Sequence, residues 1–124
     1  MADQEETKHL AQEIKRANSQ KALAQARAEY IRLLEKDDWR VTTRALTDGR
    51  PILRAIGVAY PTECAVVDKV LDLLKANHPI KAIGMGEPQG VHGIAHVMKG
   101  GYLEDLYIKI KIDADIVYIL SFHQ

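Results

Sequence analysis

Cysteine is almost absent from this sequence, because Cys64 is the single one among 124 residues. A lone cysteine excludes an internal disulfide framework and a cysteine-rich zinc site, and it is typical of a reducing cytosol. Long hydrophobic runs are also lacking, since no apolar stretch approaches the ~20 residues of a membrane-spanning helix. Residues 1–6 are acidic, unlike the basic and then apolar start of a secretion signal. We therefore expect a cytoplasmic protein.

An excess of charge of either sign is lacking as well, because 17 lysine and arginine residues balance 17 aspartate and glutamate residues. Proteins that bind nucleic acid mainly through phosphate contacts are usually basic overall. Any role on RNA or DNA would therefore require a local basic patch. The hydrophobic share of 47% is ordinary for a globular protein, and the length suits one compact domain.

Metal-binding and phosphate-binding motifs are also missing. His92, His96 and His123 suggest a metal site by type, but no histidine or cysteine pair has a known metal-ligand spacing. The segment 84–86 has too few glycines, and no following Gly-Lys-Ser/Thr, to form a phosphate-binding loop. Cys64 on an apolar helix is more typical of core packing than of a reactive thiol. We expect neither a metal nor a cofactor.

The first half of the chain is predicted to be helical. Residues 4–36 have apolar side chains at helical spacing, as one long helix or as two helices broken near Asn18 and Ser19. Residues 48–51 are typical of a turn, after which Pro51 would begin a short helix that ends at Gly57. Thr62 is the expected N-cap of a clearer helix that ends before residues 77–79.

From residue 80 onward the apolar period changes to two, which is typical of strands. Strands are predicted at residues 80–85, 91–98, 106–112 and 116–123, separated by short loops. This order predicts an α+β domain in which N-terminal helices pack on one face of a four-stranded antiparallel sheet. The opposite face of the sheet is expected to stay open.

The alternation also predicts the register of the last hairpin. A three-residue loop at 113–115 pairs Ile112 with Ile116 and places Tyr107 opposite Ser121, one diagonal step from His123. In that register the buried face holds Leu106, Ile108, Ile110, Ile112, Ile116, Tyr118, Leu120 and Phe122. The open face holds Tyr107, Lys109, Lys111, Val117, Ile119, Ser121 and His123. A two-residue loop would shift every pairing by one and move His123 to the far side.

A phenol, ammonium groups and an imidazole on one open sheet face could cleave RNA without a metal. The reaction needs a base for the 2′-hydroxyl proton, cations for the charged phosphorane and an acid for the leaving oxygen. His123 could be the acid or the base, because an imidazole titrates near neutrality. Lys109 and Lys111 could hold phosphate, and Tyr107 could donate a hydrogen bond or stack on a base. The alternative is an ordinary solvated strand face.

Residues 40–123 resemble the MqsR (motility quorum-sensing regulator) toxins, which are ribonucleases of bacterial toxin–antitoxin pairs with a RelE-like fold. The resemblance rests on segments that agree in order and spacing: Thr42-Thr43-Arg44, Gly57 followed by Cys64, Lys81, Tyr107-Ile108-Lys109-Ile110 and Ser121-Phe122. It implies a RelE-like α+β domain at residues 39–124, similar to microbial ribonucleases, with residues 1–38 as an N-terminal helical extension. It also implies RNA as substrate, and a cognate antitoxin or immunity protein as partner.

The resemblance further implies catalytic residues. Family members are thought to cleave mRNA with a lysine on the first strand, a glutamine on the second, a tyrosine on the third and a basic residue after Ser-Phe. Three of these positions correspond to Lys81, Tyr107 and His123, where histidine replaces the family's lysine. The glutamine is lost, and His96 stands beside the gap as a fourth catalytic candidate.

Substrate contacts are expected from the loop before the second strand and from the third strand. Gln89 or His92 could replace the missing glutamine, while Lys109 and Lys111 would hold the RNA backbone. The sequence thus predicts a metal-independent endoribonuclease toxin of the mRNA-interferase kind. Two alternatives stay open: a tRNA-directed nuclease toxin of a delivered effector, and a catalytically inactive adaptor that binds protein.

Overall fold

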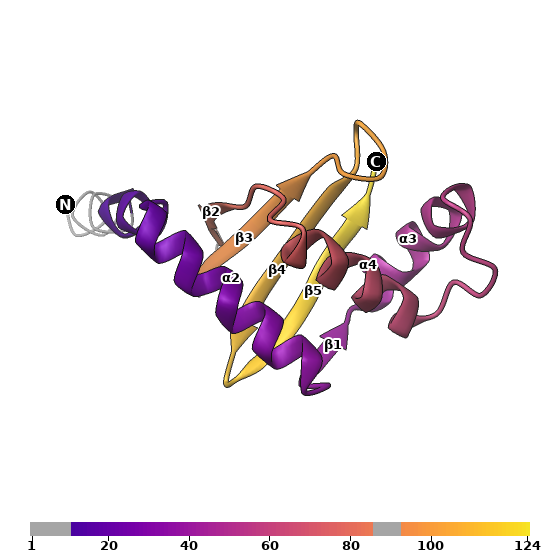
Figure 1. The fold of residues 1–124 in the computed structure, drawn as a ribbon, viewed down its shortest axis with the longest axis horizontal. Helices are drawn as coiled ribbons and strands as arrows, with labels where there is room; N and C mark the ends of the chain where they lie inside the picture. Colours follow the sequence, from indigo (N-terminus) through magenta and orange to yellow (C-terminus); the bar gives the residue numbers. More distant parts are fainter. Residues whose placement is uncertain (1–10, 86–92) are drawn as a thin grey trace.

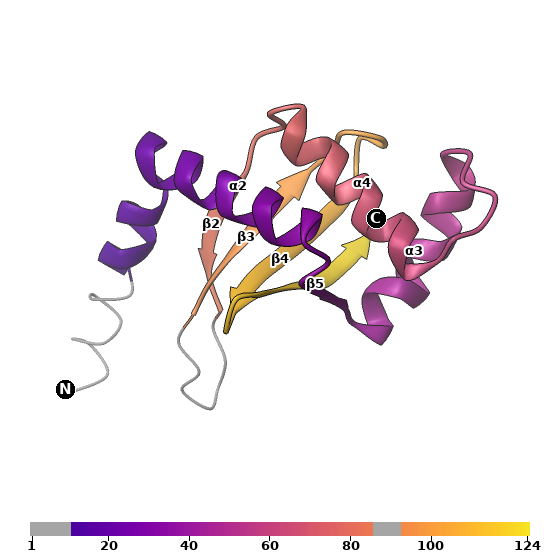
Figure 2. The same cartoon turned by 60° about the horizontal axis from the view of Figure 1, so that its bottom comes forward.

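A computed structural model describes residues 11–85 and 93–124. In this part of the chain, helices pack on one face of a five-stranded mixed sheet, so the expected α+β class is confirmed. The helices are α2 (Gln20–Glu35), α3 (Thr43–Ala55) and α4 (Glu63–Lys75), and residues 11–17 are helical as well. The strands are β1 (Trp39–Val41), β2 (Lys81–Gly84), β3 (Ile94–Lys99), β4 (Tyr107–Asp113) and β5 (Ile116–His123). Figures 1 and 2 show α2 and α4 lying across the same face of the sheet.

The sheet has the strand order β1-β5-β4-β3-β2. The expectation of four antiparallel strands is wrong by one strand, because β1 adds a parallel edge beside β5. The backbone N–H of Thr42, the residue after β1, donates to the carbonyl oxygen of Ile119 and continues this pairing. At three residues, β1 is too short to produce a recognisable alternation of apolar and polar side chains.

Two predicted helix boundaries are confirmed. The N-terminal helical segment breaks where expected, and α2 begins with Ser19 as its N-cap. Asn18, at the break, pairs its side-chain amide with both backbone groups of Ala82: Nδ2 donates to the carbonyl oxygen at 3.0 Å and Oδ1 accepts from N–H at 2.8 Å. The Asn18 side chain thereby provides hydrogen-bond partners for the backbone N–H and carbonyl of one residue on the edge strand β2. Thr62 caps α4 as expected, accepting a hydrogen bond from the N–H of Ala65.

The turn expected at residues 48–51 is wrong, because these residues lie inside α3. Thr42 caps this helix, and Gly49 is buried in its middle. A Cβ on Gly49 would lie 3.0 Å from Cδ1 of Phe122 on β5, closer than most carbon contacts. Glycine is therefore present because helix and strand approach closely here. Pro51 is tolerated in the helix interior, although it lacks the N–H that would donate to the carbonyl of Thr47.

One hydrophobic core lies between the helices and the sheet. The side chains of α2 that reach it are Tyr30, Leu33 and Leu34, all at most 2% exposed. They join a single cluster that also holds Leu53, Val66, Val70, Leu74, Met98, Ile108, Ile110, Ile119 and Phe122. Residues of α2 therefore share one core with residues of the segment 39–124.

The last hairpin differs from its predicted register in two places that compensate each other. The loop contains Ala114 and Asp115, both with positive φ, so Asp113 pairs with Ile116. Near this loop the predicted faces are wrong: Val117 and Ile119 are buried, whereas Ile116, Tyr118 and Leu120 are only half-buried. A β-bulge opposite Lys109 and Ile110 then inserts one extra residue into β5 and shifts the alternation by one.

The bulge determines the outer end of the hairpin. Beyond it, Phe122 lies on the buried face, as expected, and its partner on β4 is Ile108. His123 is directly opposite Tyr107 rather than one diagonal step away. The two residues therefore share the open face of the sheet despite the two-residue loop.

Candidate active site on the open sheet face

The open face of the sheet is the one opposite α2 and α4. Side chains of directly paired residues lie on the same face, so the register places polar side chains from several strands together. One cross-strand row contains Lys99, Tyr107 and His123, from β3, β4 and β5. The next row contains Lys81, Val97, Lys109 and Ser121. A third row brings Lys111, Tyr118 and Arg40 together.

Tyr107 and His123 form the centre of the candidate site. Their ring centroids are 5.2 Å apart and the ring planes are inclined by 27°, so the rings are stacked. Nδ1 of His123 lies 2.9 Å from the main-chain oxygen of Gln124. Because that oxygen can only accept, Nδ1 carries the proton, and in the neutral ring the lone pair lies on Nε2. The ring is half-buried, so Nε2 is a basic nitrogen that a substrate can approach.

The open face is strongly basic although the whole chain is neutral. Its rows contain five cationic side chains: Arg40, Lys81, Lys99, Lys109 and Lys111. Among the described residues, none of these five forms an ion pair, whereas Lys36, Arg32 and Lys75 of the helical side each pair with a carboxylate. The acidic residue that alternates with the lysines of β4 is Asp113, at the hairpin loop. The local basic patch that an RNA-binding role requires is therefore present.

Most of the predicted site residues within the described ranges lie on this face. Tyr107, Lys109, Lys111 and His123 are neighbours on β4 and β5. Lys81 lies on the same face, but β3 separates its strand from β4. Neighbouring strands are ~4.8 Å apart, so Lys81 is about 10 Å from β4 and about 14 Å from β5. Gln89 and His92 lie outside the described residues.

Lys99 is a site residue that the sequence did not predict. It ends β3 and pairs directly with Tyr107, so it is the strand cation nearest to the stacked rings. Lys99 and Lys81 also line a hollow of about 190 Å³ with Pro79, Ile80 and Val97. Lys99 was missed because the predicted second strand ends at residue 98, which leaves Lys99 in a loop. Arg40 was missed because its side depends on the pairing of β1 with β5, and Tyr118 was missed because its side depends on the two-residue hairpin loop.

His96 lies on the other face, so its expected place beside Tyr107 and His123 is wrong. It is 8% exposed and pairs with Ala82 and Ile110 in the sheet, under helix α2. Its Nδ1 lies 2.8 Å from the Tyr30 hydroxyl, which also lies 3.3 Å from the carbonyl oxygen of Ile110. The carbonyl only accepts, so both hydrogen bonds form together when Nδ1–H donates to Tyr30 and Tyr30 donates to Ile110. His96 thus belongs to a buried polar network of the core.

The burial of His96 predicts a pH-dependent stability. Desolvation lowers the pKa of His96 below its ordinary 6.5, so the unfolded chain binds a proton more readily than the folded chain. The free energy of unfolding should therefore fall as the pH drops below about 6.5, by at most about 1.4 kcal/mol per pH unit. Urea unfolding between pH 7 and pH 5 measures this slope. In His96→Asn, which has an amide near the position of Nδ1 but does not titrate, the slope should be smaller; an equal slope in both proteins would contradict this assignment.

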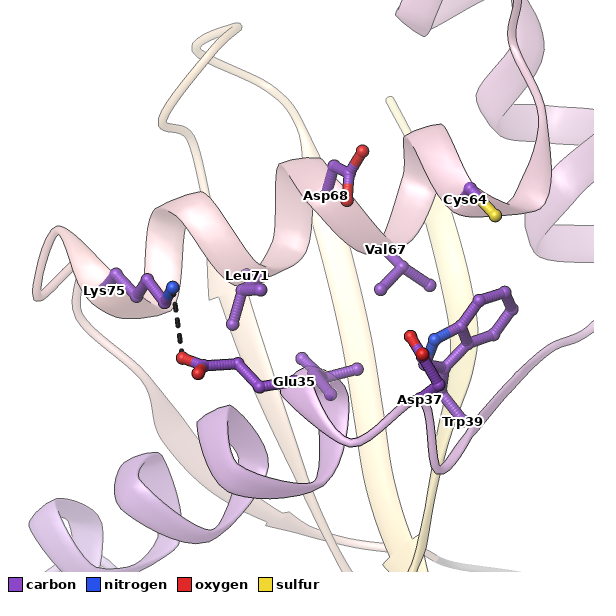
Figure 3. Close-up of a pocket in the computed structure, with 9 residues that line it drawn as sticks. Glu35, Asp37, Trp39, Cys64, Val67, Asp68, Leu71 and Lys75 are labelled. Carbon is purple, nitrogen blue, oxygen red and sulfur yellow. Dashed lines mark ion pairs between the residues drawn. The ribbon is translucent and has the colours of Figure 1, made fainter.

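A second hollow lies on the helical side, between the end of α2 and the length of α4 (Figure 3). It has a volume of about 340 Å³, and its lining includes Trp39, Asp37 and Cys64. Lys75 and Glu35 form an ion pair of 3.0 Å at its edge. Cys64 is exposed here, so its expected role in core packing is wrong.

Metal-ligand clusters and membrane-spanning helices are both absent from the described residues. Within residues 11–85 and 93–124, no three histidine, cysteine, aspartate or glutamate side chains gather in a way that could hold a metal ion. No helix in these ranges combines the length and the hydropathy needed to cross a membrane.

Comparison with known proteins gives no match: no family model, no curated protein and no solved structure matches this chain. The similarity to MqsR toxins and the RelE-like fold therefore stay predictions from the sequence.

Proposed function

We propose that this protein is a metal-independent RNA endonuclease that cleaves by attack of a ribose 2′-hydroxyl on the adjacent phosphate. The observation that carries the proposal is the stack of Tyr107 on His123 within a row of cations on an open sheet face. Open sheet faces with exposed aromatic and basic side chains are a common surface for single-stranded RNA.

His123 is the proposed general base. Its Nε2 lone pair takes the proton of the 2′-hydroxyl, and the 2′-oxygen then bonds to phosphorus. The bond from phosphorus to the 5′-oxygen of the next nucleotide breaks, and this oxygen takes a proton from water, which leaves a 2′,3′-cyclic phosphate and a 5′-hydroxyl. The hydrogen bond from Nδ1 to the main-chain oxygen of Gln124 supports this role, because it holds the ring in one tautomer and stabilises the imidazolium that forms.

The lysines and the phenol are proposed to act on the phosphate. Lys99 is directly opposite Tyr107, and Lys109 follows Tyr107 by two residues on the same strand face. Their ammonium groups can stabilise the negative charge that increases on the phosphorane. The hydroxyl of Tyr107 can donate a hydrogen bond to the leaving 5′-oxygen. Lys81 and Lys111, farther along the face, would hold neighbouring phosphates of the chain.

The resemblance to MqsR toxins extends this proposal to a biological role. A cytoplasmic ribonuclease of a toxin–antitoxin pair would act on mRNA and would be neutralised by a cognate protein. The basic open face supports this extension in one respect, because an acidic partner could cover it and exclude RNA. A tRNA-directed nuclease and an inactive adaptor are the other outcomes of the test below.

The proposal is tested by incubating the purified chain with a mixture of single-stranded RNAs and, separately, with total tRNA, both in excess EDTA. Cleavage of tRNA alone would favour the tRNA-directed nuclease. We expect cleavage that EDTA does not reduce, because none of the proposed steps uses a metal. Products with 2′,3′-cyclic phosphate ends, detected by mass spectrometry, would identify the 2′-hydroxyl as the nucleophile. RNA with 2′-O-methyl groups at every position should stay intact. Intact unmodified RNA, bound or unbound, would contradict the nuclease and favour the adaptor.

A further inference from the structure

A hollow between α3 and the end of β5 adjoins the candidate active site. It has a volume of about 430 Å³ and is lined by Arg44, Thr47, Asp48, Pro51, His123 and Gln124. This volume lies within the ~300–1,000 Å³ that small-ligand sites occupy. Because His123 is part of the lining, a group seated in the hollow would lie beside the proposed general base.

The helix α3 presents one polar face to this hollow. Arg44, Thr47, Asp48 and Pro51 are spaced by three, one and three residues, which places them along one side of a helix. The neighbouring stripe, with Ala45, Gly49 and Ile52, is buried. The close contact of Gly49 with Phe122 holds the helix against β5 one residue before His123.

The start of α3 is also fixed to β5. The side-chain oxygen of Thr42 accepts from the N–H of Ala45 and donates to the carbonyl oxygen of Leu120 at 3.3 Å. The backbone N–H of Thr42 donates to Ile119. The backbone of β5 therefore fixes the position of the polar face of α3 relative to His123. This fixed position gives the hollow a defined shape.

The hydrogen-bonding groups that line the hollow indicate which kind of ligand it would bind. Arg44 donates hydrogen bonds, Thr47 and Gln124 can donate or accept, and Asp48 only accepts. The carboxylate of Asp48 would repel a phosphate group, because both are negatively charged. The edge of a nucleobase presents donors and acceptors together, and an exocyclic amino group is a donor that a carboxylate recognises. Asp48 is 3.8 Å from Arg44 in an ion pair whose side chains are 41% and 87% exposed, so this weak pair leaves Asp48 able to bind a ligand.

We propose that this hollow is a nucleobase subsite, in which Asp48 accepts a hydrogen bond from the exocyclic amino group of a base next to the scissile phosphate. The inference rests on the proposed function, because it assigns a base preference to the same cleavage reaction. A pyrimidine shows the contrast most directly: cytosine carries an amino group where uracil carries a carbonyl oxygen.

The experiment uses oligonucleotides with one cleavable ribonucleotide in a 2′-O-methyl chain, so that a single phosphate can be cut. Cytosine and uracil are exchanged on the 5′ side of this phosphate and, in a second pair, on its 3′ side. We expect kcat/KM to favour cytosine on one side by about fivefold or more. In Asp48→Asn that ratio should fall toward one, because the amide can serve either base. Asp68→Asn, the same change at an exposed position on α4, should leave the ratio unaltered.

The two proposals fail in different ways. Cleavage with the same cytosine-to-uracil ratio in wild type and Asp48→Asn would overturn the subsite and leave the nuclease standing. If the wild type cuts none of the oligonucleotides, the nuclease is wrong, and a titration with cytidine and uridine monophosphates decides on the subsite. Backbone amide signals of residues 44–50 that shift with the cytidine nucleotide but not with the uridine nucleotide would support it. The absence of such shifts would overturn it.

Discussion

Replacing His123 by alanine is expected to lower the rate of RNA cleavage by about 10²- to 10⁴-fold, the usual contribution of a general base. Among the described residues of the open face, His123 is the one side chain for which the structure defines a tautomer, with Nδ1–H bonded to Gln124. The rate constant is measured under single-turnover conditions with an excess of protein.

Two further experiments test whether His123 acts through its lone pair or through its stack on Tyr107. Free imidazole in the buffer should restore part of the activity of His123→Ala, because it can occupy the vacated space and take the proton. Tyr107→Phe keeps the stack of 5.2 Å but removes the hydroxyl, so it should lower the rate while leaving the general base in place. An His123→Ala protein that folds and cuts RNA at the wild-type rate would exclude His123 as the base.

The site could be anticipated from the sequence only because two deviations of one residue compensate each other. A two-residue hairpin loop requires positive φ at both positions, which glycine and asparagine favour. The sequence has Ala114 and Asp115 there, so a three-residue loop was the more reasonable expectation. The bulge on β5 has no signature in the run of apolar residues 116–120. Alternation alone therefore could not determine which side His123 would occupy.

Helix α3 and His96 show a different limit of sequence reasoning. Gly49 and Pro51 usually signal a turn, but Gly49 is selected by its close contact with Phe122, which is remote in sequence. His96 was assigned to the site by its place beside a motif, whereas its partner Tyr30 lies 66 positions away. Thr62, by contrast, was recognisable as a cap because capping depends on residues a few positions apart. Local chemistry was predictable, and long-range packing was not.

Removing three lysines from the open face is expected to weaken RNA binding by about 100-fold at 0.1 M salt. The variant is Lys99→Ala, Lys109→Ala and Lys111→Ala together, which takes one cation from β3 and two from β4. Each phosphate contact to a single strand contributes about 0.7 to the slope of log affinity against log salt. The loss of three contacts should therefore reduce the slope by about two. Binding is measured with fully 2′-O-methylated RNA, so that cleavage does not interfere.

The matched control removes the same charge from the other side of the molecule. Lys15 lies on the helical segment that precedes α2, and Lys21 and Lys36 lie at the two ends of α2, which covers the opposite face of the sheet. Their triple replacement by alanine gives the same net charge but should change the affinity and the slope far less. Since both variants have the same net charge, a difference between them locates the RNA on the open face. If the two variants lose the same affinity for RNA, binding depends only on net charge. That result would contradict the open face as the binding surface.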